Sequence, residues 1–228
     1  LRHPEPGEGD LRAVSDLVGD DENNTTYQVM AAENLQRQYT FMASLVDNAI
    51  DLRRPLLSHE IVKALNFHAI ACLHSSAGEY RPSEVHVAGR NCPPHARVPA
   101  LMNAFIDEVN RWWHETDALY LAAYVLWKIC WIHPFVNGNG RAARAACYYV
   151  LCAKSGAWLS GQPILPELIR ANRQPYVDAL QHAHDAWANG RVDLVLLHAF
   201  LSGLLQTQLA SVPQSQPATG TQSGGGGP

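Results

Sequence analysis

The sequence of 228 residues has little net charge, few cysteines and no long apolar run, and each shortage excludes a class of protein. A formal net charge of −4 offers no basis for general binding to nucleic acid or to an anionic membrane surface. The longest apolar run, residues 119–132, is too short for a bilayer and contains Lys128. The N-terminus lacks an initiator Met and an apolar signal segment, so we expect a cytoplasmic protein or a fragment that has lost a targeting segment.

The five cysteines are an odd number at irregular spacing. This pattern fits neither a disulfide framework nor a zinc site, and we expect free thiols. His182, His184 and His198 also lack Cys or carboxylate partners at ligand spacing, so we interpret them as surface or packing residues.

Composition divides the chain into three parts. Residues 1–24 are rich in Pro, Gly and acidic residues, and residues 211–228 form a low-complexity tail that ends in glycines and a proline. Such segments cannot bury enough apolar surface to fold, so we expect both to be flexible. Residues 25–210 are predicted to form one domain.

Apolar residues in that domain recur mostly with a helical period. Thr25 or Thr26 would N-cap a helix that runs to about Ile50, and Ser58 would cap a helix that ends near Gly78. The stretch 118–131 is apolar on nearly every side, which indicates a central helix buried by its neighbours. Further helices are expected at about 98–114, 140–155, 163–171, 173–188 and 191–209.

One stretch, residues 79–89, departs from the helical period. Val85 and Val87 are two residues apart and flanked by glycines, which indicates a short surface hairpin. The sequence therefore predicts an all-α helical bundle with one short β-hairpin.

Residues 133–141, His-Pro-Phe-Val-Asn-Gly-Asn-Gly-Arg, carry the clearest functional pattern. Gly138 and Gly140 expose backbone N–H groups beside the N-terminus of the next helix, where anions bind. Arg141 and Arg144 would add guanidinium groups for phosphate oxygens. His133 suits proton transfer near neutral pH. Together these residues indicate phosphoryl transfer; the alternative is a plain turn between two helices with a packing histidine.

The longer pattern His133-Pro134-Phe135-x-Asn137-Gly138-Asn139-Gly140-Arg141-x-x-Arg144 resembles the signature of the Fic family, HPFx[D/E]GNGRxxR. The likeness extends to the segment 77–94, to Asn172-Arg173-x-x-Tyr176, and over roughly residues 26–208. It implies the Fic fold, a helical bundle with a β-hairpin flap. It also implies transfer of AMP from ATP to a Ser, Thr or Tyr hydroxyl of a target protein.

The resemblance implies a role for each matched residue. His133 would deprotonate the target hydroxyl, and Phe135 would anchor the loop in the core. The α- and β-phosphates would be held by Gly138, Asn139, Gly140 and Arg141, and the γ-phosphate by Arg144. The flap, with Val85, His86 and Val87, would hold the target by strand addition, and Asn172 and Tyr176 would lie near the nucleoside.

Asn137 departs from the signature, which usually has Asp or Glu at this position as a Mg²⁺ ligand. The Asn side chain still offers a carbonyl oxygen, and Mg²⁺ accepts neutral oxygen ligands along with water and phosphates. We therefore expect Mg²⁺ (or Mn²⁺) to be used with ATP, but to be bound more weakly.

The segment Val29-Met30-Ala31-Ala32-Glu33-Asn34 resembles the inhibitory pattern [S/T]xxxE[G/N] of many Fic proteins, apart from Val29. The resemblance implies that Glu33 pairs with Arg144 and blocks the γ-phosphate. The alternative is a solvated glutamate on an amphipathic helix.

Other functions stay open at this point. The same fold could transfer UMP, a phosphate or phosphocholine, or remove a modification with Glu33 orienting a water. From a different class, the chain could be a catalytically weak binding module. Self-modification and homodimer formation are further expectations besides ATP and the target protein.

Overall fold

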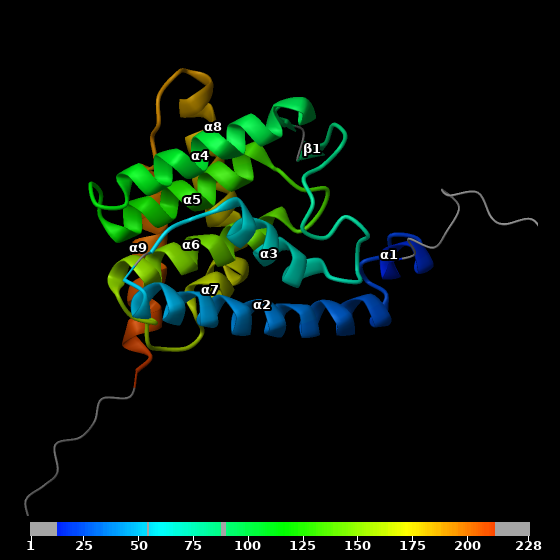
Figure 1. Ribbon diagram of the computed structural model, residues 1–228, viewed down its shortest axis with the longest axis horizontal. Helices are drawn as coiled ribbons and strands as arrows, with labels where there is room; N and C mark the ends of the chain where they lie inside the picture. The colour runs from blue at the N-terminus through cyan, green and yellow to red at the C-terminus, as the bar shows by residue number, and fades with distance from the viewer. Residues whose placement is uncertain (1–12, 54, 88–89, 213–228) are drawn as a thin grey trace, which may run out of the picture.

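The computed structural model describes residues 13–53, 55–87 and 90–212 (Figure 1). Over these ranges it is a bundle of helices with one small hairpin, as predicted. The helices are α1 (Val14–Leu17), α2 (Thr25–Asp51), α3 (His59–Ile70), α4 (Val98–Trp112), α5 (Ala118–Ile132), α6 (Asn139–Ser155), α7 (Leu165–Ala171), α8 (Arg173–Ala188) and α9 (Val195–Ala210), with a 3₁₀ turn at His95–Arg97.

The hairpin consists of two antiparallel strands, β1 (His86–Val87) and β2 (Arg90–Asn91). His86 pairs with Asn91, and Val87 pairs with Arg90. The predicted flap therefore exists but extends two residues beyond its expected end, and its residues 88–89 lie outside the described residues.

Side-chain caps explain where several helices begin. Asn24 accepts a hydrogen bond from the Thr26 N–H at the start of α2, and Ser58 accepts one from Ile61 at the start of α3. Each cap satisfies a backbone donor that has no partner inside the helix. The predicted cap at Ser58 is confirmed, whereas α2 is capped by Asn24 and not by Thr25 or Thr26.

The predicted end of α3 near Gly78 is wrong, because the helix stops at Ile70. Ala71 is extended, with ψ of 132°, and Cys72 has a left-handed φ of 62°. The Asn66 side chain then accepts a hydrogen bond from the Gly78 N–H at 2.9 Å, which folds the following turn back onto α3. This bond, and the change of backbone conformation at Ala71 and Cys72, take the place of a further helical turn.

The core lies around α5, which runs between α4 and α6 in Figure 1. Its side chains are buried on all faces, as its apolar sequence predicted. Lys128 is the charged residue of this helix. Its ammonium lies 3.9 Å from the ring centre of Trp187 and 4.8 Å from that of Trp127. Burial among these rings lowers the pKa of Lys128 to about 8. No helix of the described ranges is long and apolar enough to cross a membrane.

Part of the N-terminal segment that was predicted to be flexible is folded. The N–H groups of Val14 and Ser15 donate to the carbonyls of Cys72 and Leu73 at 2.9 and 3.0 Å. Backbone bonds to a distant turn hold α1, and composition does not reveal such bonds. The flexibility predicted for residues 1–12 and 213–228 concerns segments outside the described residues.

Candidate active site

His133 occupies the C-terminal cap of α5 in a conformation that few non-glycine residues adopt. Its φ of 52° and ψ of 61° are left-handed, while its N–H still donates to the Ile129 carbonyl at 2.9 Å. Pro134 cannot continue the helix because it has no N–H to donate. The chain therefore leaves α5 at His133 and turns into the motif loop.

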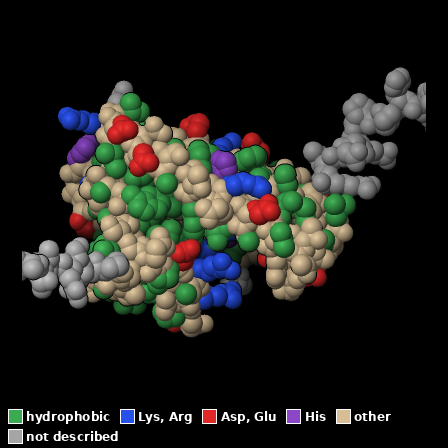
Figure 2. Space-filling view, turned by 90° about the horizontal axis from the view of Figure 1, so that it is seen from below, with side chains coloured by type: hydrophobic (Ala, Val, Ile, Leu, Met, Phe, Trp, Pro, Cys, Tyr) green, Lys and Arg blue, Asp and Glu red, His purple; other side chains and the backbone are tan. Residues whose placement is uncertain are grey.

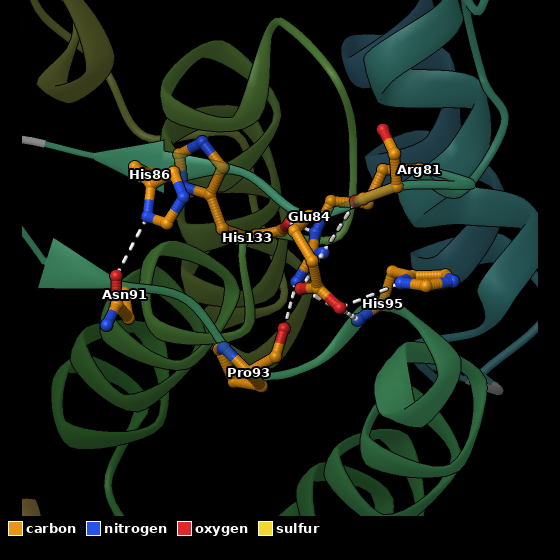
Figure 3. A network of polar contacts seen from close by, with 8 residues as sticks. Arg81, Glu84, His86, Asn91, Pro93, His95 and His133 are labelled. Atoms are coloured by element: carbon orange, nitrogen blue, oxygen red, sulfur yellow. Dashed lines mark hydrogen bonds and ion pairs between the residues drawn. The ribbon is translucent and has the colours of Figure 1, made fainter.

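Arg81 holds His133 and the root of the hairpin together (Figure 3). Its guanidinium is buried and donates to the carbonyls of His133 at 2.8 Å, of Ser83 at 2.9 Å, and of Pro93. Its backbone N–H donates to the Pro134 carbonyl at 2.8 Å. The planar fork of an arginine suits several carbonyls at once, and here it joins two segments into one rigid unit. The sequence reasoning included Arg81 only as part of the flap likeness.

The motif loop is closed by Asn139 and anchored by Phe135. The Asn139 side chain accepts from the Phe135 N–H at 2.9 Å and donates to the Phe135 carbonyl at 2.8 Å. Phe135 is fully buried, so its predicted anchoring role is confirmed. Because the Asn139 side chain is bonded inside the loop, the phosphate contact predicted for Asn139 would have to be made by its backbone N–H.

Gly138 and the start of α6 form the predicted concave turn. Gly138 has a φ of +76°, and an added Cβ would lie 2.8 Å from Asn66 Nδ2 and 2.8 Å from Ile70 Cγ2. Among the described residues, the N–H groups of Asn139 and of the two residues after it have no acceptor. Free N–H groups at a helix N-terminus attract anions.

Asn137 lies between an arginine and a glutamate. Its Oδ1 accepts from Arg141 at 3.1 Å, and its Nδ2 donates to Glu22 Oε1 at 3.3 Å. Arg141 also donates to the Ala69 carbonyl at 3.0 Å, which fixes its guanidinium. Glu22 comes from the turn before α2, in a segment predicted to be flexible, so the sequence reasoning missed it.

A cavity of about 410 Å³ lies beside the motif loop. Its walls come from the hairpin, α5, α6, α7 and α8, and they include Val87, His133, Gly140, Arg144, Ile169, Tyr176 and His184. Tyr176 is buried, and its hydroxyl lies 3.3 Å from Cys130 Sγ. The structure therefore brings His133, Gly140, Arg144 and Tyr176 together, as predicted.

Asn172, predicted to lie near the nucleoside, is not among the residues that line this cavity. Its side chain donates to the Leu168 carbonyl at 2.9 Å, and its own carbonyl accepts from the Tyr176 N–H at 3.2 Å. Through these bonds Asn172 connects α7 to α8. Sequence spacing alone could not distinguish this structural role from contact with a ligand. Arg170, Arg173 and His184 line the cavity and were not predicted.

A second cavity, of about 590 Å³, adjoins the first through Arg144 and Arg170, which line both. Arg141 adds a third guanidinium, and Glu22 is the carboxylate among its lining residues. Figure 2 shows Lys and Arg side chains gathered beside a hollow on the face viewed from below. Three guanidinium groups against one carboxylate make this cavity suitable for an anion.

Glu33 does not enter the second cavity. It pairs with Arg37 at 3.0 Å on the exposed side of α2, and 57% of its side chain is exposed. The face of α2 that lines the cavity carries Ala31 and Ala32 instead. Residues 28, 31, 32 and 35 share a face at the helical period, and residue 33 lies off it. The predicted pairing of Glu33 with Arg144 is therefore wrong.

The imidazole of His133 is half-buried, and its pKa differs from the near-neutral value expected. Burial lowers the pKa of His133 to about 4, and the charges of Arg90 and Arg81 act in the same direction. Arg90 reaches from β2 to donate to the Cys130 and Trp131 carbonyls at 3.0 and 3.2 Å. At neutral pH the imidazole is therefore uncharged and able to accept a proton.

The hairpin forms one rim of the first cavity. Val87 lines the cavity, whereas His86 points to Asn91, with 2.8 Å between His86 Nδ1 and Asn91 Oδ1 (Figure 3). Val85 precedes β1 and is half-buried. Arg81 at the root and Arg90 on β2 attach this rim to the end of α5.

These features define a helical domain in which a neutral histidine, Gly140 at the start of α6 and Arg144 share one cavity. Residues 56–151 of the chain match the model of the Fic/DOC family. The family resemblance of the motif is thereby confirmed.

Relatives named protein adenylyltransferase Fic are similar in sequence. The protein from Nematostella vectensis is 30% identical over 145 residues, covering 61% of this chain and 28% of the relative. The protein from Aedes aegypti is 32% identical over 114 residues, covering 47% and 20%. The chain thus spans less than a third of the length of either relative.

Two solved structures share the fold. Fic-1 from C. elegans has a TM-score of 0.63 at 19% identity, covering 79% of this chain and 49% of that one. A Fic-domain-containing signalling protein from Bacteroides thetaiotaomicron has a TM-score of 0.63 at 20% identity, covering 78% and 70%. At these identities the likeness establishes the architecture alone.

Proposed function

We propose that the chain is a protein adenylyltransferase, which moves AMP from ATP to a Ser, Thr or Tyr hydroxyl of a target protein. The observation that carries the proposal is the neutral imidazole of His133 in one cavity with Gly140 and Arg144. The names of the sequence relatives support the same activity.

His133 acts as the base. As the target oxygen attacks the α-phosphorus, the imidazole accepts the hydroxyl proton and an O–P bond forms. The bond between the α-phosphorus and the oxygen that bridges to the β-phosphate breaks, and pyrophosphate leaves. The N–H groups at the start of α6 stabilise the phosphate oxygens without reorganising, and Arg141 joins them when a phosphate replaces its contact with Asn137.

The two cavities divide the donor between them. The apolar walls of the first, including Ile169 and Tyr176, suit the nucleoside. The second cavity, beyond Arg144, suits the terminal phosphates because Arg141 and Arg170 also line it.

His184 supports recognition of the base. Trp127 Nε1 donates to His184 Nδ1 at 3.2 Å, and a tryptophan N–H cannot accept. A neutral His184 therefore carries its proton on Nε2, and burial lowers its pKa to about 4. Its position in the cavity wall provides a fixed donor for an acceptor atom of the nucleobase.

The hairpin is proposed to hold the target. Its strands are two residues long, and an extended peptide can add to such an edge. Val85, His86 and Val87 would contact the target near His133. Arg81 and Arg90 keep this edge at a fixed place relative to the base.

Mg²⁺ (or Mn²⁺) is proposed to accompany ATP and to neutralise phosphate charge when bound. No cluster of three or more His, Cys, Asp or Glu side chains in the described ranges could hold a metal ion. The oxygen chemistry at Asn137 and Glu22 nevertheless fits Mg²⁺, which commonly uses one or two protein ligands together with substrate phosphates.

Incubation with each labelled nucleoside triphosphate and Mg²⁺ tests the proposal. We expect label from ATP on a target or on the chain itself, and a loss of about 10²-fold or more in His133→Ala. His182→Ala is the matched control, since His182 pairs with Asp193 outside the cavity. Label from UTP alone would indicate a different transfer. Intact nucleotide binding with no label from any donor would indicate a binding module.

A further inference from the structure

Glu22 lies beside the residue at which the chain departs from its family signature. The motif position that usually has Asp or Glu is Asn137, and Glu22 Oε1 is 3.3 Å from its Nδ2. Neither side chain belongs to the other's local sequence, because 115 positions separate them. The fold thus brings a carboxylate to the place where the motif has lost one.

The position of Glu22 is fixed by contacts on both sides. The Tyr27 hydroxyl donates to Glu22 Oε1 at 3.2 Å and lies 3.0 Å from His74 Nε2. The turn that carries Glu22 follows α1, whose Val14 N–H donates to the Cys72 carbonyl. Glu22 therefore belongs to the folded domain and remains exposed enough to contact a ligand.

The spacing suits two oxygen ligands of one small cation. Neighbouring ligands of an octahedral Mg²⁺ at about 2.1 Å lie roughly 3.0 Å apart, close to the separation of Glu22 Oε1 and the Asn137 amide. An oxygen of Asn137 faces Glu22 after a half-turn of the amide, which breaks the two hydrogen bonds that Oδ1 accepts from the Gly138 N–H and from Arg141, so cation binding has to compensate for them. Arg141, which now contacts Oδ1, would then be available to a phosphate.

We propose that Glu22 supplies the carboxylate ligand that Asn137 cannot supply to the divalent cation of the nucleotide site. The inference rests on the proposed function, since the cation arrives with ATP. It assigns a metal-binding role to a residue upstream of the motif. Tyr27 is a positioning residue in this site, because it contacts Glu22 rather than the cation.

Mn²⁺ binding tests the proposal without any transfer reaction. The apparent Mn²⁺ affinity is measured by electron paramagnetic resonance, with the full chain and a non-hydrolysable ATP analogue. Glu22→Gln should weaken it by about tenfold or more, since even the loss of a group that only supports a ligand costs about 10–100-fold. Asp21→Asn is the matched control, since the Asp21 side chain accepts from the Asn23 N–H and does not line the cavity. Adding Asn137→Asp to Glu22→Gln should restore the affinity.

Three results would overturn the assignment. Equal Mn²⁺ affinity in wild type and Glu22→Gln removes the ligand role. Stronger metal-free binding of the analogue to Glu22→Gln, with unchanged Mn²⁺ affinity, would make Glu22 a counter-ion of the arginines instead. If the wild type binds no analogue with or without Mn²⁺, the proposed function fails as well, which separates that failure from the first two.

Discussion

The two cavities that meet at Arg144 are lined by different chemistry. Both contain arginines, and Arg144 and Arg170 line each of them. The first adds neutral histidines and apolar side chains from α5, α7 and α8, whereas the second adds Arg141, Glu22 and the small residues of α2. Burial of His133 and His184 lowers their pKa, so the first cavity gains no positive charge from them near neutral pH. The difference shows how one ligand with a flat base and a charged tail can be oriented along the site.

The largest effect is expected from a substitution in the motif loop, which lies beside both cavities. In Gly138→Ala the new Cβ would lie 2.8 Å from Asn66 Nδ2 and from Ile70 Cγ2, at a φ of +76°. We expect ATP binding to be lost and stability to fall by about 1–3 kcal/mol, because strain and close contact combine.

Gly156→Ala is the control for Gly138→Ala. Gly156 has a φ of +73° at the end of α6, but no atom lies within 4 Å of its added Cβ. It should lose about 1 kcal/mol from backbone strain alone and keep ATP binding. Equal effects of the two variants in denaturant unfolding would contradict the close packing of the motif loop on α3.

Acid should destabilise the folded chain through the two histidines of the first cavity. His133 and His184 have pKa values of about 4 in the folded chain, below the ordinary value of about 6.5. Between those values the unfolded chain binds protons that the folded chain does not, so the free energy of unfolding falls as pH decreases from 6.5 towards 4. Denaturant unfolding across this range measures the slope. His184→Gln should flatten it, and an identical slope in that variant would exclude the contribution of His184.

A smaller effect is expected from the base-recognition residue. His184→Ala should weaken ATP binding about fivefold, since a neutral hydrogen bond contributes about 1 kcal/mol. Calorimetry with ATP and with deaza analogues identifies the acceptor atom. The analogue that lacks this atom should bind wild type more weakly than ATP does, but should bind His184→Ala as well as ATP does. Equal losses for every analogue in both proteins would remove the specific contact.

The smallest effect is expected on the outer face of α2. Glu33→Gln should leave self-modification unchanged, because Glu33 pairs with the exposed Arg37. Labelled ATP and gel quantification measure this against wild type. A clear rise in self-modification would restore Glu33 as a brake and require α2 to rotate.

Local patterns predicted much of this site because the relevant contacts are close in sequence. His133, Phe135, the glycines of the motif loop and Arg144 lie within twelve residues of one another. The buried helix α5 was evident from its uninterrupted apolar residues. The early end of α3 was missed because Asn66 binds Gly78 across a turn with no strong local signal.

By itself the sequence determined the helical class, the hairpin, the motif loop and the family, because helix periods, caps and backbone-binding glycines are local properties. Tertiary structure alone decided which side chains reach the loop. It places Glu22 beside Asn137, and it lets Arg81 donate to the His133 carbonyl. It also pairs Glu33 with Arg37 on the exposed side of α2, and it bonds the Asn172 side chain to α7. Those outcomes depend on how helices pack and on the rotational position of α2, which a single sequence does not specify.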